Sequence, residues 1–272
     1  MKYMSHNDIR NKWFQFFESK GHKRVESASL IPVNDNSLLW INAGVSPLKK
    51  YFDGSEVPEC RRIVNIQKCI RTNDIENVGI TKRHQTFFEM MGNFSVGDYF
   101  KNEAIEFAFE LLTGEEWFSI PKELLYVTVY PDDHEAYQKW IEVGLDEAHI
   151  IKLEENFWEI GEGPCGPDSE IFFDRGEKYD PNHDALDKFK QDEEQERFVE
   201  IWNNVFSQFN SKEGIPRSEY KELPSKNIDT GAGLERWCCV FQNVDSTFET
   251  DLFQPIIKHI EQLVGFSYEC QK

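Results

Sequence analysis

The chain has 272 residues, enough for one large domain or two small ones, and its 14% aromatic content excludes a disordered protein. No segment approaches the roughly 18 apolar residues of a membrane helix, and the polar first residues predict no secretory signal, so we expect a cytoplasmic protein without a membrane partner. The net charge of −19 is uneven, because residues 1–83 carry 14 Lys and Arg against 9 Asp and Glu. Phosphate binding is therefore expected in this first third.

The first 130 residues predict two helices and five strands. Ser5 and Asp8 have the spacing of a capping box, so a helix should begin there and end at Gly21. A second helix is expected at residues 102–112, where the apolar residues recur at helical spacing. The strands are expected at residues 30–33, 38–42, 61–73, 84–96 and 124–130.

The middle of the chain predicts one helix, capped by Asp132 or Asp133 and ending near Gly144. Strand-like residues at 150–160 should lead into a rigid turn at 161–170, where glycine and proline cluster. Residues 174–197 contain nine acidic and five basic residues. We expect them to form a surface insertion made of a loop and an exposed helix.

Alternating side chains in residues 198–209 predict a strand. Ile201, Asn203 and Val205 should share one face of it, with their neighbours on the other. The remaining elements should be a strand at 226–229, a helix from Leu234 and a last helix capped by Asp251. Because the strands follow one another without regular βαβ alternation, an α+β fold with an antiparallel sheet flanked by helices is expected.

Arg71 and the residues after it form the first candidate site. Arg71 ends a predicted strand, where a guanidinium can bind two phosphate or carboxylate oxygens. Lys82, Arg83 and His84 follow across a polar loop, and Phe88 offers a ring on which a nucleotide base could stack. Taken singly, basic loop residues are usually solvated and strand phenylalanines usually belong to the core.

The second candidate site runs from Asp229 to Arg236. A predicted strand ends in Asp229, Gly231 and Gly233 allow a close backbone approach, and Arg236 lies in the first turn of a helix. Neither a Walker pattern nor G-x-G-x-x-G is present, so the spacing alone does not identify a nucleotide site.

A third candidate combines an amide, a small apolar wall and a ring. Asn203 and Val205 share a strand face, and Trp158 lies on another predicted strand. Together they could line a pocket for a small molecule, although each is more often found in core packing. The six cysteines and seven histidines are scattered, so we expect reduced thiols and no zinc site.

Four long segments in order resemble the alanyl-tRNA synthetase family. Residues 71–101 resemble motif 2 of that family and residues 227–237 its motif 3. Residues 156–174 and 200–210 are similar to two further segments of its active site. The resemblance runs from about residue 5 to residue 264, nearly the whole chain.

The resemblance implies a class II aminoacyl-tRNA synthetase catalytic domain. ATP and L-alanine would give alanyl-adenylate and pyrophosphate, and the alanyl group would then pass to tRNA(Ala). Mg²⁺ would assist, and catalysis would consist of positioning and charge neutralisation. Residues 1–250 should form this domain, and residues 251–272 should start a connection to a tRNA-recognition domain. Without that domain we expect a monomer that binds tRNA weakly.

The resemblance also assigns residues by position. Arg71 and Arg236 should be catalytic, with Arg71 on the α-phosphate and the alanine carboxylate. The ATP site should comprise Arg71, His84, Gln85, Phe88, Met90, Trp158, Ile201, Asn203, Gly233 and Arg236. The alanine site should comprise Trp158, Asn203, Val205, Asp229 and Gly231, with Asp229 on the ammonium group. No Mg²⁺ ligand is assigned. Many members have histidine at the position of Gln85 and cysteine at that of Asp168.

Two other interpretations compete with this one. A standalone ligase could pass activated alanine to a carrier protein or a small amine, which assays with different acceptors would reveal. A non-catalytic paralogue would be expected to lack Arg71, Asp229 or Arg236, and all three are present.

Overall fold

The computed structural model describes residues 1–33, 38–73, 75–82, 84–159, 163–193 and 195–268. Within them the strands form one sheet in the order β1-β2-β3-β9-β8-β7-β4-β5, and β6 pairs with β7 beside this path. The strands are β1 (Lys23–Arg24), β2 (Arg62–Ile70), β3 (Phe87–Val96), β4 (Leu125–Val129), β5 (Ile150–Lys152), β6 (Phe157–Trp158), β7 (Gly163–Asp174), β8 (Phe198–Ser211) and β9 (Lys221–Gly233).

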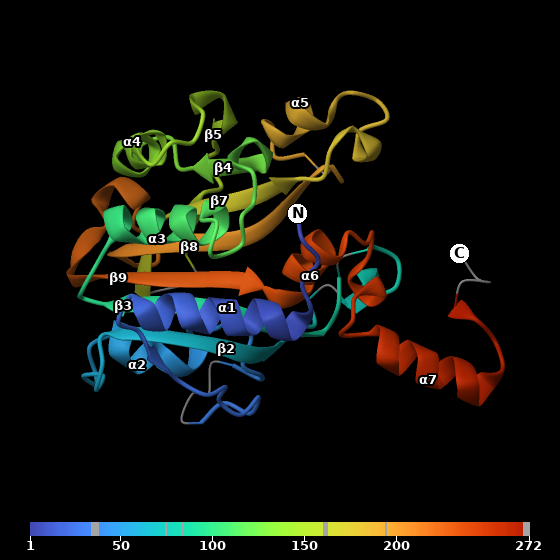
Figure 1. Cartoon of the computed structure of the whole chain (residues 1–272). Helices are drawn as coiled ribbons and strands as arrows, with labels where there is room; N and C mark the ends of the chain where they lie inside the picture. Colours follow the sequence, from blue (N-terminus) through green and yellow to red (C-terminus); the bar gives the residue numbers. More distant parts are fainter. Residues whose placement is uncertain (34–37, 74, 83, 160–162, 194, 269–272) are drawn as a thin grey trace.

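The predicted α+β class is confirmed, with one difference in the sheet. β1 with β2 and β4 with β5 are parallel pairs, and the other pairings are antiparallel, so the sheet is mixed. Helices flank it: α1 (His6–Ser19), α2 (Lys49–Phe52), α3 (Lys101–Thr113), α4 (His134–Glu142), α5 (Ala185–Phe189), α6 (Leu234–Gln242) and α7 (Gln254–Val264). Figure 1 shows α1 and α3 lying across one face of the sheet, with α7 standing away from it.

Helix α1 forms as its sequence predicts. The Asp8 amide donates to Ser5 Oγ at 3.2 Å, and the Ser5 amide donates to the Asp8 carboxylate at 3.0 Å, which completes the capping box. Gly21 follows the helix with a φ of +80°, a conformation that glycine adopts without strain. The predicted helix is thus confirmed, and its apolar face, which includes Trp13 and Phe17, is buried against the sheet.

An aromatic core fills the space between the helices and one face of β8. The Trp13 ring lies 4.8 Å from the Trp202 ring and 5.8 Å from the Trp237 ring of α6, measured between centroids. Phe206, which lies in β8 with Trp202, is fully buried. Burying a side chain of this size stabilises the fold by about 1.5–3 kcal/mol. The core therefore covers one face of β8 and leaves the opposite face to the residues described below.

The strands expected at residues 30–33 and 38–42 are absent. Leu39 is 80% exposed and Val33 is 79% exposed, and only Ile41 of the second segment is buried. The backbone amide of Ile41 donates to the Leu30 carbonyl, and the Ile41 carbonyl accepts from Ile70. The segment thus touches the edge of β2 at one residue, and its remaining apolar side chains face solvent.

The rigid turn expected at residues 161–170 is instead the first half of β7, although residues 161 and 162 lie outside the described part of the chain. A Cβ atom at Gly166 would lie 2.0 Å from the Phe206 carbonyl oxygen of β8. The glycine therefore permits a close approach of two strands, next to a register shift between Cys165 and Asp168. A cluster of glycine and proline predicted a turn where the structure has an irregular strand.

Two expectations about the acidic segment and the last helix are also wrong. Helix α5 is not exposed throughout, because Ala185 and Phe189 are buried against Phe198. Asp251 does not cap α7, since its carboxylate accepts from the amide of His6 and from the Gln242 side chain. No helix in the described ranges is long and apolar enough to cross a membrane.

Candidate active site

The centre of the candidate site is the open face of three adjacent strands, β7, β8 and β9. Their register places Asp168, Val205 and Asp229 directly opposite one another in one row. The next row contains Glu170, Asn203 and Gly231. Backbone pairing thus brings together four of the five residues assigned to the alanine site, all except Trp158.

Asn203 is held by two carboxylates of the neighbouring strand. Its Nδ2 donates to Asp168 Oδ2 at 2.7 Å and lies 3.4 Å from Glu170 Oε1. Its Oδ1 is buried and has no hydrogen-bond partner among the described residues. The amide therefore presents an unused acceptor at the centre of the three strands.

Asp229 contributes an almost buried carboxylate, 9% exposed, that forms no ion pair in the described part of the chain. Burial raises the pKa of Asp229 to about 7. The pKa of Asp168 is also raised to about 7, mainly by burial, and its hydrogen bond from Asn203 opposes the shift. Two carboxylates on either side of Val205 give this part of the site an affinity for a cation such as an ammonium group.

Met90 of β3 fills the space beside Gly231. A Cβ atom at Gly231 would lie 2.9 Å from Met90 Sδ, so even alanine would push the thioether away. Met90 Sδ in turn accepts from the Gly44 amide at 3.3 Å. At Gly233 a Cβ atom would meet only methylene carbons of Arg236, at 3.8 Å or more, so crowding does not explain that glycine.

Arg71 follows the end of β2 and is exposed. Its Nε donates to the Asn42 carbonyl at 2.9 Å, and its guanidinium carbon lies 5.2 Å from the centroid of the Phe88 ring. These contacts hold the side chain beside Phe88 through one edge of the guanidinium. The fork of terminal nitrogens can then bind a carboxylate or a phosphate.

Arg236 lies in the first turn of α6 and reaches Glu200 of β8. Its Nη1 donates to Glu200 Oε2 at 2.6 Å and to the Glu200 carbonyl at 3.1 Å. A cavity of about 550 Å³ contains Arg236, Glu200 and Glu170 together with His84. Burial, then the charges of Glu200 and Asp168, raise the pKa of Glu170 to about 9. The positive charge of Arg236 therefore does not balance the carboxylates that line the cavity with it.

The sequence pattern did not indicate Glu170 or Glu200, and Ile201 shows why. Ile171 of β7 pairs with Trp202 and Phe172 pairs with Glu200, so Ile201 is an extra residue in the ladder. The bulge turns the Ile201 side chain into the core, where it is 2% exposed, and turns Glu200 toward Arg236. The buried Ile201 side chain therefore gives no support to the expected contact with ATP. Strict alternation would have placed Glu200 on the core face of β8, whereas its side chain contacts Arg236.

The other predicted residues lie around this centre. His84 Nδ1 lies 2.6 Å from Thr81 Oγ1, and Gln85 Oε1 is buried without a hydrogen-bond partner among the described residues. Trp158, in β6, is partly buried and pairs with Gly166. Arg83 lies outside the described residues.

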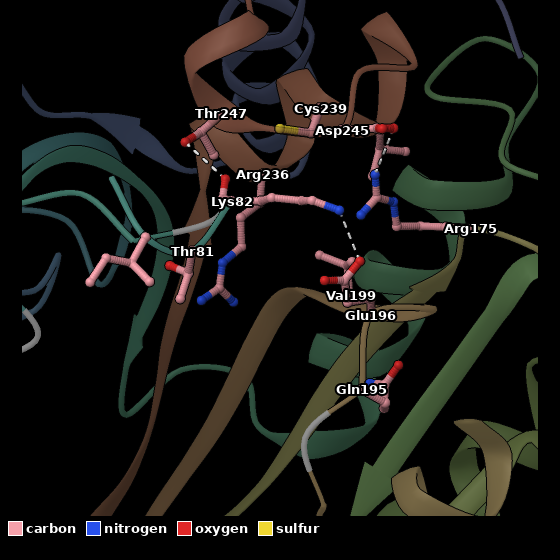
Figure 2. Close-up of a pocket in the computed structure, with 12 residues that line it drawn as sticks. Thr81, Lys82, Arg175, Gln195, Glu196, Val199, Arg236, Cys239, Asp245 and Thr247 are labelled. Carbon is pink, nitrogen blue, oxygen red and sulfur yellow. Dashed lines mark hydrogen bonds and ion pairs between the residues drawn. The ribbon is translucent and has the colours of Figure 1, made fainter. Parts of the chain in front are cut away.

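A second, smaller cavity of about 230 Å³ lies on the other side of Arg236. Figure 2 shows Lys82 reaching to Glu196, with Nζ 3.0 Å from Oε2, and Arg175 beside Asp245. The Lys82 carbonyl also accepts from the Thr247 amide at 3.1 Å. These contacts fasten the loop before His84 to the acidic segment and to the residues between α6 and α7.

Comparisons with known proteins show the family of the chain. The family model for tRNA synthetases class II (A) matches residues 8–272. Alanine–tRNA ligase of Lactococcus lactis subsp. cremoris is 61% identical over 268 residues, 98% of this chain and 31% of the relative. The enzyme of the same name from Streptococcus agalactiae serotype III is 60% identical over 269 residues, 99% of this chain and 31% of the relative. This chain thus spans about a third of the length of these relatives.

Among solved structures, apo histidyl-tRNA synthetase of S. aureus is similar in fold, with a TM-score of 0.52 and 9% sequence identity. The similarity covers 89% of this chain and 67% of that one. Since the family model covers nearly the whole chain, from α1 through the three strands of the site to α7, this protein belongs to the class II (A) tRNA synthetase family.

Proposed function

We propose that this chain activates L-alanine with ATP, and that the full-length protein transfers the alanyl group to tRNA(Ala). The observation that carries the proposal is the pair of buried carboxylates around Val205, which suits a small amino acid with an ammonium group. Relatives about 60% identical over nearly the whole chain are named alanine–tRNA ligases. All of those names are of tRNA ligases, which gives no support to a non-tRNA acceptor.

In this proposal the substrates bind on two sides of the site. Asp229 holds the ammonium group, Asn203 accepts a second hydrogen bond, and Val205 with Trp158 limits the space for the side chain. Arg71 binds the alanine carboxylate and the α-phosphate together. Because the alanine carboxylate and the oxygens of the α-phosphate are both anionic, a shared guanidinium reduces their repulsion and brings the carboxylate within reaction distance of the electrophilic phosphorus.

The nucleotide lies along Arg71, Phe88 and Arg236. Phe88 stacks on the adenine ring, and Arg236 neutralises phosphate charge or covers the other face of the base. His84 and Gln85 lie near the distal phosphates, while Met90 and Gly233 border the nucleotide. The roles of His84 and Arg236 are supported by the cavity that both line, and those of Arg71 and Phe88 by the contact between them.

The chemical step needs no protein nucleophile. A carboxylate oxygen of alanine attacks the α-phosphorus, and the bond from that phosphorus to the bridging oxygen of pyrophosphate breaks. Arg71 stabilises the negative charge that develops on the α-phosphate. Alanyl-adenylate remains in the pocket and pyrophosphate leaves.

Mg²⁺ fits the carboxylates of this site. No cluster of three or more His, Cys, Asp or Glu side chains able to hold a metal occurs in the described ranges. Mg²⁺ is usually bound by one or two carboxylates together with substrate phosphates, and Glu170 and Glu200 supply such a pair beside Arg236. When bound, the ion would neutralise phosphate charge.

ATP–pyrophosphate exchange with each of the twenty amino acids tests the proposal. We expect exchange to depend on ATP and alanine, with every other amino acid slower. Exchange that requires a different amino acid, or no exchange by a folded protein, would contradict it. We also propose that the chain acts in the cytoplasm and is monomeric alone. It should charge tRNA poorly, since it spans about a third of its relatives' length.

A further inference from the structure

Asp168 is the residue of the site that the proposed chemistry does not use. It is 4% exposed and forms no ion pair within the described part of the chain. Its partner is the Asn203 side chain, 2.7 Å away on the neighbouring strand. The amide of Asp168 itself donates to the Asn156 carbonyl at 2.9 Å, which fixes the backbone from which the carboxylate projects.

The contact determines which way the Asn203 amide points. An ionised carboxylate accepts hydrogen bonds and cannot donate one, so the ionised form of Asp168 selects the NH₂ end of the amide. The oxygen end is thereby turned away from Asp168. It is buried and has no partner among the described residues, a condition that costs free energy unless a ligand supplies a donor.

The register adds a second constraint. Asp168 and Asp229 both lie opposite Val205, one on β7 and one on β9, while Asn203 is two residues along β8 on the same face. A ligand donor above Val205 would therefore meet Asp229 and the Asn203 oxygen together. An ammonium group has three N–H donors and can satisfy both.

We propose that Asp168 is a positioning residue for the ammonium group of the amino-acid substrate, acting through the Asn203 amide. This inference rests on the proposed function and assigns a role to a residue that contacts neither ATP nor the reacting carboxylate. A buried carboxylate without a cation is unfavourable for the empty fold, so stability alone does not explain its presence.

The test uses Asp168→Asn, which keeps the shape and removes the charge, in pyrophosphate exchange. With the selective acceptor lost, Asn203 can turn its amide, and the KM for alanine should rise about 10- to 100-fold, as for loss of one hydrogen bond to a charged group. The KM for ATP should stay within about twofold. An alanine KM within about twofold of the original would overturn the proposal.

Two inhibitors separate the ammonium from the rest of the substrate. L-Alaninol keeps the ammonium group and lacks the carboxylate, so the variant should bind it more weakly by a factor similar to that for alanine. Propionate keeps the carboxylate and lacks the ammonium group, so its inhibition should not change. Equal weakening of both inhibitors would mean a general disturbance of the pocket and would contradict the proposal.

Asp174→Asn is the matched control on the same strand. Asp174 binds Arg197 through two contacts of 2.7 Å and is also buried, so this variant should lower the melting temperature without changing the alanine KM. Asp168→Asn should instead melt at the same temperature or higher. If the original chain shows no exchange, the proposed function fails, and calorimetric titration of alanine into the original and the variant then decides the role of Asp168 separately.

Discussion

The two sides of the site hold their charged groups in different ways. On the nucleotide side, defined by Arg71, Phe88 and Arg236, the arginines lie at the ends of elements and already contact a carbonyl or a carboxylate. On the amino-acid side, defined by Asp168, Asn203 and Asp229, the carboxylates lie within strands, buried and poorly neutralised.

This difference bears on what each side can recognise. Strand register fixes the position of the amino-acid side, so its specificity depends on the backbone. Each arginine of the nucleotide side is held by few contacts, Arg71 by the Asn42 carbonyl and the Phe88 ring and Arg236 by Glu200, and can adapt to a flexible triphosphate. The cost of the buried carboxylates is offset only when a cation binds, which makes the amino-acid side selective for a ligand with an ammonium group.

The largest expected effect is on the nucleotide side. Arg71→Ala removes the guanidinium proposed to bind the alanine carboxylate and the α-phosphate together, and exchange should slow by about 10²–10³, as for the loss of one preorganised donor to a transition state. Initial rates at saturating ATP and alanine, with circular dichroism as a folding control, measure this. A folded variant with near-normal exchange would remove Arg71 from the site.

The amino-acid side should discriminate poorly between alanine and its near relatives. Val205 and Trp158 form the proposed wall of the pocket, and an apolar wall rejects an added hydroxyl by only about 10². Serine should therefore support exchange at roughly a hundredth of the alanine efficiency, and glycine somewhat better. Serine exchange at background would mean that a contact within the pocket excludes the hydroxyl.

The buried carboxylate of Asp229 predicts opposite effects of pH on binding and on stability. Burial raises the pKa of Asp229 to about 7, and only the ionised form attracts an ammonium group. The alanine KM should therefore be level well above pH 7 and rise up to about tenfold per unit below it. Kinetics from pH 6 to 8 measure this, and a flat profile would mean that Asp229 is ionised throughout.

Stability of the empty protein should change in the other direction. The folded pKa of Asp229 lies above the unfolded value, so the folded state binds the proton more tightly between about pH 4 and 7. The contribution of Asp229 to the free energy of unfolding is fully present below that window and is lost as the pH rises through 7. Substrate-free melting temperatures should fall less with pH in Asp229→Asn than in the original.

Sequence patterns predicted the elements whose signals are local. The capping box at Ser5 located α1, and alternation along β8 placed Asn203 and Val205 on one face. The predictions that were wrong concerned features that depend on contacts between distant segments. Gly166 allows Phe206 to approach, and the bulge at Ile201 exchanges the faces of Glu200 and Ile201. Neither leaves a pattern in its own segment, so the pairing of Glu200 with Arg236 could not be predicted.

The roles of the site residues came from family resemblance more than from spacing. G-x-G at 231–233 predicted only a close backbone approach, and in the structure Met90 fills the space where a side chain at position 231 would lie. In the sequence, the only feature that drew attention to Asp168 was that many family members have cysteine at this position. Its importance became visible only when the register placed it beside Asn203.

The division of the site into two sides is tested most directly by Asp229→Asn. The variant keeps the shape of the side chain and removes one charge from the amino-acid side only. The account predicts that the KM for alanine rises by about 10- to 100-fold, as for a lost charge-assisted hydrogen bond, while the KM for ATP stays within about twofold. An unchanged alanine KM, or equal increases for both substrates, would contradict it.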